Sequence, residues 1–158
     1  ATECHNLVRS LGLQEHIRFL GFQRVEALMP QIGLVVLSSI SEALPLVLLE
    51  GYAAGVPTVT TDVGSCRQLV EGLDDEDRAL GHSGMVVPIA DPQRLADAAL
   101  ALLGDTAAWQ AASQAAIARV ERYYTDTLMF ARYRKVYETA LERTPPAPHA
   151  PGDPAWQA

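Results

Sequence analysis

The sequence has 158 residues, enough for one domain with a hydrophobic core, and 49% of them are apolar, as in ordinary globular proteins. The net charge of −7 argues against the basic surface of a nucleic-acid-binding or membrane-docking domain. Cys4 and Cys66 have no metal-ligand spacing and suit a reducing compartment, and nothing in the sequence motivates a disulfide between them. The chain begins with Ala-Thr-Glu rather than methionine, which suggests a piece of a longer protein.

Helix and strand signals alternate over the first part of the chain. Residues 2–11 have the apolar spacing of a helix that ends at Gly12. Residues 17–20, Ile-Arg-Phe-Leu, predict a strand, and residues 25–29 predict a short helix. This alternating order predicts an α/β fold.

The next stretch predicts a βαβ unit. Residues 33–38 form a short apolar run, typical of a buried parallel strand. Pro45 suits the first turn of a helix, Gly55 suits its end, and residues 58–61 predict the next strand. The loops that follow the two strands therefore lie at the carboxyl edge of the sheet, where open α/β folds bind ligands.

Two glutamates belong to this unit. Glu50 and Tyr52 alone carry polar side-chain atoms between Pro45 and Gly55, and a carboxylate on so apolar a helix needs a partner or the rim of a cleft. Composition alone leaves Glu50 equally open to a surface role. Glu42, in the loop before the helix, is by itself an ordinary complement to a helix amino end.

Residues 65–71 predict a short helix whose amino end is a natural anion site near the same edge. Arg67 has two open interpretations, either added charge for that site or a surface ion pair with Glu71. The acidic run at residues 74–77 is interpreted as part of a solvated loop.

The last third of the chain is mostly helical. Residues 85–87 predict a strand, Asp91 caps a helix that runs to Gly104, and Asp105 starts another. A final helix begins near Asp126, and its apolar residues are expected to point inward: Met129, Tyr133, Val136, Tyr137 and Leu141. Residues 144–158 predict a disordered, proline-rich tail.

Four ordered motifs carry a family resemblance. Seven residues separate Glu42 from Glu50, and the other motifs are Gly55-Val-Pro57 with Asp62-Val-Gly64, residues 84–88 and residues 91–96. This arrangement resembles the retaining, nucleotide-sugar-dependent glycosyltransferases of family 4 (group 1), over residues 6–141. The amino-acid sequence of residues 40–45 and 62–67 is most similar to that of the Pel-type exopolysaccharide glycosyltransferases.

The resemblance implies the carboxy-terminal half of a two-domain GT-B enzyme, with a Rossmann-like parallel sheet and flanking helices. It also implies that the last helix crosses back to brace the other domain, which leaves some of its apolar face without a partner in this chain. Residues 1–143 then form a donor-nucleotide-binding domain that is incomplete at its amino end. The family's basic Arg/Lys pair, which neutralises the pyrophosphate, and the amino-terminal acceptor domain have no counterpart in this sequence. We therefore expect this chain alone to be inactive.

The resemblance also assigns roles in the site. Glu50 holds the ribose hydroxyls of the donor, and Glu42 lies at the donor sugar as the catalytic carboxylate. Backbone amides around Ala43, Leu44 and Leu46 face the sugar and phosphates, and the family usually has glycine where Ala43 stands. Further donor contacts are expected from the following loop and helix: Gly64, Ser65 and Arg67. No metal and no cofactor are implied.

The implied reaction is transfer of a hexose, with retention, from a UDP-sugar or another NDP-sugar to a growing glycan or polysaccharide. The implied partners are this donor, the glycan acceptor, the missing amino-terminal domain and a membrane-bound polysaccharide synthesis complex, with no nucleic acid. The implied location is the cytoplasm, including the inner face of the membrane. Two alternatives stay open, a non-catalytic assembly module of such a complex and a sugar-nucleotide epimerase, although the histidine motifs of the latter are not found.

Overall fold

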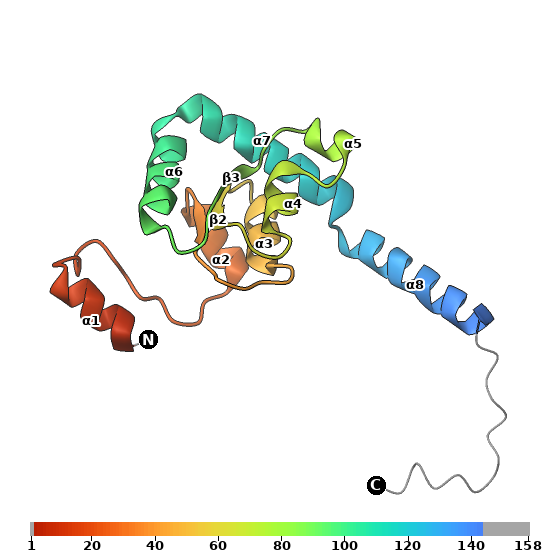
Figure 1. Cartoon of the computed structure of the whole chain (residues 1–158), viewed down its shortest axis with the longest axis horizontal. Helices are drawn as coiled ribbons and strands as arrows, with labels where there is room; N and C mark the ends of the chain where they lie inside the picture. The colour runs from red at the N-terminus through yellow and green to blue at the C-terminus, as the bar shows by residue number, and fades with distance from the viewer. Residues whose placement is uncertain (1, 144–158) are drawn as a thin grey trace, which may run out of the picture. The chain divides into compact units, whose positions relative to one another are not determined.

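The computed structural model describes residues 2–143, and the chain divides between Ile32 and Gly33 into two compact units (Figure 1). The proline-rich tail expected at residues 144–158 lies outside the described residues. Each unit is considered by itself, and the predicted site residues all belong to the second unit.

The first unit contains helical elements only. These are α1 (Thr2–Ser10), α2 (Val25–Leu28) and the 3-10 helix η1 (Met29–Gln31). The helix predicted at residues 2–11 is confirmed, but the strand predicted at residues 17–20 is wrong. An extended segment needs a hydrogen-bonded neighbour, and within the described chain the sheet contains only strands of the second unit.

The second unit is built on a parallel sheet of three strands in the order β1 (Val35–Leu37), β2 (Thr58–Thr61) and β3 (Gly84–Val87). All four residues of the central strand β2 are buried. Because the strands are parallel, the loops after them emerge at one edge of the sheet. This confirms the α/β fold and the βαβ unit expected from the sequence.

Helices follow and flank the strands, and several begin where capping residues predicted them. They are α3 (Leu46–Ala53), α4 (Cys66–Glu71), α5 (Asp75–Arg78), α6 (Pro92–Gly104), α7 (Thr106–Tyr123) and α8 (Asp126–Arg143). The Asp91 carboxylate accepts a hydrogen bond from the Arg94 amide at 2.9 Å, and Asp105 caps α7 in the same way. Helices α6 and α7 pack on β2 and β3 around Val59, Val87, Leu102 and Ala112.

The acidic run at residues 74–77 is not simply solvated. Asp74 caps α5, and Asp77, on that helix, is 1% exposed. The Asp77 carboxylate forms an ion pair of 2.6 Å with the guanidinium of Arg119, which lies on α7 and is fully buried. The solvated-loop interpretation is therefore wrong for Asp77, because a cation forty-two residues away compensates its burial.

The apolar face of α8 was expected from its periodicity to be inward, and this prediction is wrong, whereas the resemblance implied a face partly without a partner in this chain. Every residue from 129 to 142 is exposed in the structure. Six large apolar residues on this helix are between 45% and 73% exposed: Met129, Phe130, Tyr133, Val136, Tyr137 and Leu141. At the start of the helix, Leu128 is half-buried.

Tyr52 of α3 has a buried hydroxyl whose contribution to stability can be measured. Its side chain is fully buried, and its hydroxyl has no hydrogen-bond partner among the described residues. Burial raises the pKa of this phenol, although the charge of Arg119 opposes the shift. Because an unsatisfied buried hydroxyl costs about 1–3 kcal/mol, we expect Tyr52→Phe to leave the free energy of unfolding unchanged or to raise it by about 1 kcal/mol.

Urea denaturation measures this change, and Tyr124→Phe is the matched control. The Tyr124 hydroxyl accepts a hydrogen bond of 3.0 Å from Gln68 Nε2, so its removal should lower stability by about 0.5–1.5 kcal/mol. A loss of more than about 1 kcal/mol in Tyr52→Phe would contradict the assignment of an unpaired hydroxyl.

Candidate functional site

The loops after β1 and β2 are in direct contact at the carboxyl edge of the sheet. Gly64 has a φ of +52°, and a Cβ on it would lie 2.1 Å from the carbonyl oxygen of Glu42. Ser65 donates two hydrogen bonds to the carbonyl oxygen of Ala43, from its amide at 3.1 Å and from its hydroxyl at 2.7 Å. The structure thus brings together four predicted site residues, and only glycine fits at position 64.

The Glu42 side chain is half-buried and oriented by its own loop. Ser39 Oγ donates a hydrogen bond of 2.7 Å to Glu42 Oε1. The carbonyl oxygen of Ser39 in turn accepts a hydrogen bond of 2.5 Å from Thr61 Oγ1 at the end of β2. Sequence reasoning did not identify Ser39 or Thr61, because neither residue type is informative without the tertiary contact.

Glu50 lies on the exposed side of α3, whose other side buries Leu48, Gly51 and Tyr52. Among the described residues no hydrogen bond or ion pair engages the Glu50 carboxylate, so it is open to a ligand. Gly51 has a packing reason for its identity: a Cβ there would lie 2.9 Å from Val35 Cγ2 of β1. The lack of a side chain at residue 51 therefore lets the helix that carries Glu50 approach the sheet closely.

Arg67 adopts the ion-pair arrangement that the sequence left open. Its guanidinium contacts the carboxylates of Asp62 and Glu71 at 2.6 Å each, and all three side chains are at least one-third exposed. The hydrogen bonds to Asp62 and the charge of Glu71 raise the pKa of Arg67. A role in binding a phosphate would require Arg67 to leave Asp62, and exposed pairs of this kind are weak enough to exchange.

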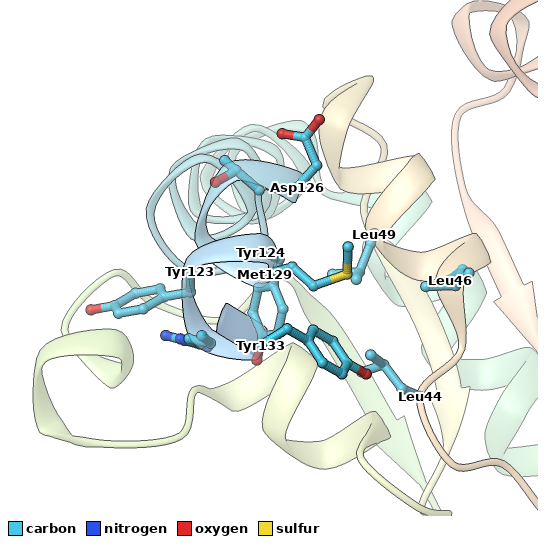
Figure 2. A pocket seen from close by; sticks show the side chains of 10 residues that line it. Leu44, Leu46, Leu49, Tyr123, Tyr124, Asp126, Met129 and Tyr133 are labelled. Carbon is cyan, nitrogen blue, oxygen red and sulfur yellow. The ribbon is translucent and has the colours of Figure 1, made fainter. Parts of the chain in front are cut away.

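An apolar cavity of about 400 Å³ lies beside the Glu42 loop (Figure 2). Figure 2 shows leucine side chains of the loop and α3 facing Met129 and Tyr133 of α8 across this cavity. The lining residues are Leu44, Leu46, Leu49, Tyr123, Tyr124, Thr125, Asp126, Met129, Arg132 and Tyr133. Because the side chains of Leu44 and Leu46 line this cavity, their expected contacts with a donor involve the backbone.

Two other kinds of site were searched for in the described part of the chain. Residues 2–143 contain no group of three or more His, Cys, Asp or Glu side chains placed to hold a metal ion. None of the described helices has the length and apolar character needed to cross a membrane. The expectation that donor binding needs no metal stays a prediction.

The model of the family described as "Glycosyl transferases group 1" matches residues 1–105, about two-thirds of the chain. The chain belongs to the group 1 glycosyltransferases. It is 35% identical, over 126 residues, to an exopolysaccharide phosphotransferase of Streptomyces coelicolor, with 78% of this chain and 13% of the relative covered.

Solved structures support the fold of this group 1 domain. The sucrose-phosphate synthase of Thermosynechococcus elongatus superposes with a TM-score of 0.78 at 23% identity, over 90% of this chain and 35% of the synthase. The Anabaena protein HepE, in complex with UDP-glucose, superposes with a TM-score of 0.71 at 25% identity, over 87% of this chain and 36% of HepE. The chain thus spans little more than a third of either protein, and it matches the carboxy-terminal domain of GT-B glycosyltransferases.

Proposed function

We propose that this chain is the donor-binding portion of a retaining glycosyltransferase that transfers a hexose from a UDP-sugar to a glycan or polysaccharide acceptor. The observation that carries the proposal is the joined pair of loops at the carboxyl edge of the parallel sheet, where Gly64 lies against the Glu42 backbone and Ser39 holds the Glu42 carboxylate. Membership of the group 1 family and the UDP-glucose complex of HepE support the choice of donor.

Each role in the proposal rests on a side chain or backbone group with suitable chemistry. A carboxylate accepts two hydrogen bonds from a ribose diol, and the free, exposed carboxylate of Glu50 suits this role. Glu42 would face the donor sugar, where charge develops as the anomeric bond ionises. The amides around Ala43, Leu44 and Leu46, with Gly64, Ser65 and Arg67, would surround the sugar and pyrophosphate without a metal.

The rest of the activity is proposed for the whole protein. A second domain would supply the acceptor site, and the cytoplasmic face of a membrane-bound polysaccharide synthesis complex would supply the acceptor. Two observations support a polysaccharide acceptor. The relative from Streptomyces coelicolor is an exopolysaccharide phosphotransferase by name, and residues 40–45 resemble the Pel-type sequence.

Titration calorimetry with UDP, GDP and ADP tests the proposed role of Glu50. We expect saturable binding of one nucleotide and at least a tenfold weaker affinity in Glu50→Gln, equivalent to about 1.4 kcal/mol, because the amide holds the ribose diol less well. Glu138→Gln, which makes the same charge change on exposed α8, is the matched control and should bind as the wild type does.

Two outcomes would count against the proposal. Unchanged affinity in Glu50→Gln would remove the ribose role from this residue while leaving the family membership intact. Failure of the wild-type chain to bind any of the three nucleotides would have two causes, a missing phosphate clamp or a non-catalytic assembly module. The second cause would be favoured if a chain extended at its amino end to include the first strands of the domain also failed to bind. The pairing of Arg67 with two carboxylates is the observation that keeps this alternative open.

A further inference from the structure

Glu42 has one described hydrogen-bond partner for its carboxylate, the hydroxyl of Ser39. The 2.7 Å bond uses Oε1 and leaves Oε2 free to accept hydrogen bonds from another molecule. A glutamate side chain has several rotatable bonds, so an unheld carboxylate would lose this freedom on binding a ligand. The Ser39 hydroxyl imposes that order before any ligand arrives.

Ser39 is itself held by the central strand of the sheet. Thr61, which is 4% exposed, donates from Oγ1 to the carbonyl oxygen of Ser39 at 2.5 Å. The hydrogen bonds therefore run from buried β2 to the backbone of Ser39 and from its side chain to Glu42. A hydroxyl anchored in this way is a more rigid donor than one on a free loop.

The backbone on the carboxyl side of Glu42 is held as well. Gly64 approaches the carbonyl oxygen of Glu42 so closely that no side chain fits between them, and Ser65 donates twice to the carbonyl oxygen of Ala43. With the main chain fixed, the bond from Ser39 sets the direction of the carboxylate.

We propose that Ser39 is a positioning residue that aims the Glu42 carboxylate at the sugar of the nucleotide-sugar donor. The inference rests on the proposed function, because it takes the donor site at this loop as given. Ser39 acts through Glu42 and has no separate contact with the nucleotide. Its loss should therefore weaken binding of the sugar-bearing donor and spare binding of the nucleotide alone.

The test compares UDP with UDP-glucose in calorimetric titrations of the whole chain and its variants. In Ser39→Ala we expect the dissociation constant for UDP-glucose to rise about fivefold to tenfold, while that for UDP changes by less than about twofold, because one charge-assisted hydrogen bond is lost. Ser39→Thr keeps the hydroxyl and should restore most of the affinity. Ser41→Ala, an exposed serine of the same loop, should leave both constants unchanged.

A double-mutant cycle checks that Ser39 acts through Glu42. In a Glu42→Ala background, Ser39→Ala should have no further effect on UDP-glucose binding. Circular dichroism of each variant shows that it is folded, and Glu42→Ala by itself should give the same sugar-selective loss as Ser39→Ala. This second variant keeps the inference testable where Ser39→Ala perturbs folding.

The outcomes separate this inference from the function on which it rests. Equal weakening of UDP and UDP-glucose in Ser39→Ala would assign Ser39 a merely structural role and overturn the inference alone. Unchanged binding of both ligands would overturn it in the same way. Failure to bind either ligand, both in the wild-type chain and in a chain extended at its amino end to include the first strands of the domain, would overturn the proposed function, and the inference with it.

Discussion

Replacing Arg119 with methionine is expected to lower the free energy of unfolding by about 3–5 kcal/mol, because it leaves the buried carboxylate of Asp77 without its counter-ion. The free energy of unfolding of a small domain is about 5–15 kcal/mol, so the loss would be a large fraction of it. Urea denaturation followed by circular dichroism measures it.

The effect is large because every N–H group of the Arg119 guanidinium donates a hydrogen bond. All five of its N–H groups donate: Nε to Asp77, Nη1 to the carbonyl of Val70 and the hydroxyl of Ser83, and Nη2 to the carbonyls of Asp77 and Gly81. These bonds connect α7 with the end of α4, with α5 and with the segment that leads into β3. Methionine fills a similar volume but satisfies none of the buried acceptors.

Arg122→Met is the matched control, one turn further along α7. Arg122 pairs with Glu76 at 2.7 Å, but both side chains are more than half exposed, and we expect a change below about 1 kcal/mol. The double variant Arg119→Met with Asp77→Leu should be more stable than the sum of its parts, because it removes the uncompensated charge. A loss below about 1 kcal/mol in Arg119→Met would show that the buried pair is not needed for stability.

Gly64→Ala is the second change with a large expected effect. The φ of +52° costs an alanine about 1–2 kcal/mol, and its Cβ would overlap the carbonyl oxygen of Glu42 at 2.1 Å. Because the obstructing atom belongs to the backbone, the loops after β1 and β2 have to separate. We expect a loss of stability above about 2 kcal/mol and, under the proposed function, no measurable binding of UDP-glucose.

Gly81→Ala separates the steric part of this effect from the conformational part. Gly81 also has a positive φ, +89°, but its added Cβ would meet only the Cβ of Ala115, at an ordinary 3.8 Å. This variant should lose stability but keep its affinity for UDP-glucose, measured by calorimetry. Retention of donor affinity in Gly64→Ala would indicate that the contact between the two loops is not needed for binding.

Local signals in the sequence determined much of the fold. Asp91 with Pro92, and Asp105 after Gly104, placed the starts of α6 and α7, because a capping carboxylate bonds an amide three residues away. Short runs rich in β-branched residues placed β1, β2 and β3. The proximity of the Glu42 loop to Gly64 also followed, since parallel strands send their loops to one edge of the sheet.

Tertiary structure alone decided which long-range groups meet. The sequence does not indicate that Asp77 pairs with Arg119, because the partner lies forty-two residues away and depends on how α7 crosses the sheet. Ser39 became informative only once the fold had placed its carbonyl oxygen beside Thr61 and its hydroxyl beside Glu42. Residues 17–20 have the composition of a strand and the apolar face of α8 has that of a core, yet in the described chain no strand pairs with the former and residues 129–142 of the latter are exposed. Helix caps and periodicity act over a few neighbouring residues, whereas burial, strand pairing and ion pairs require a second segment brought into place by the fold.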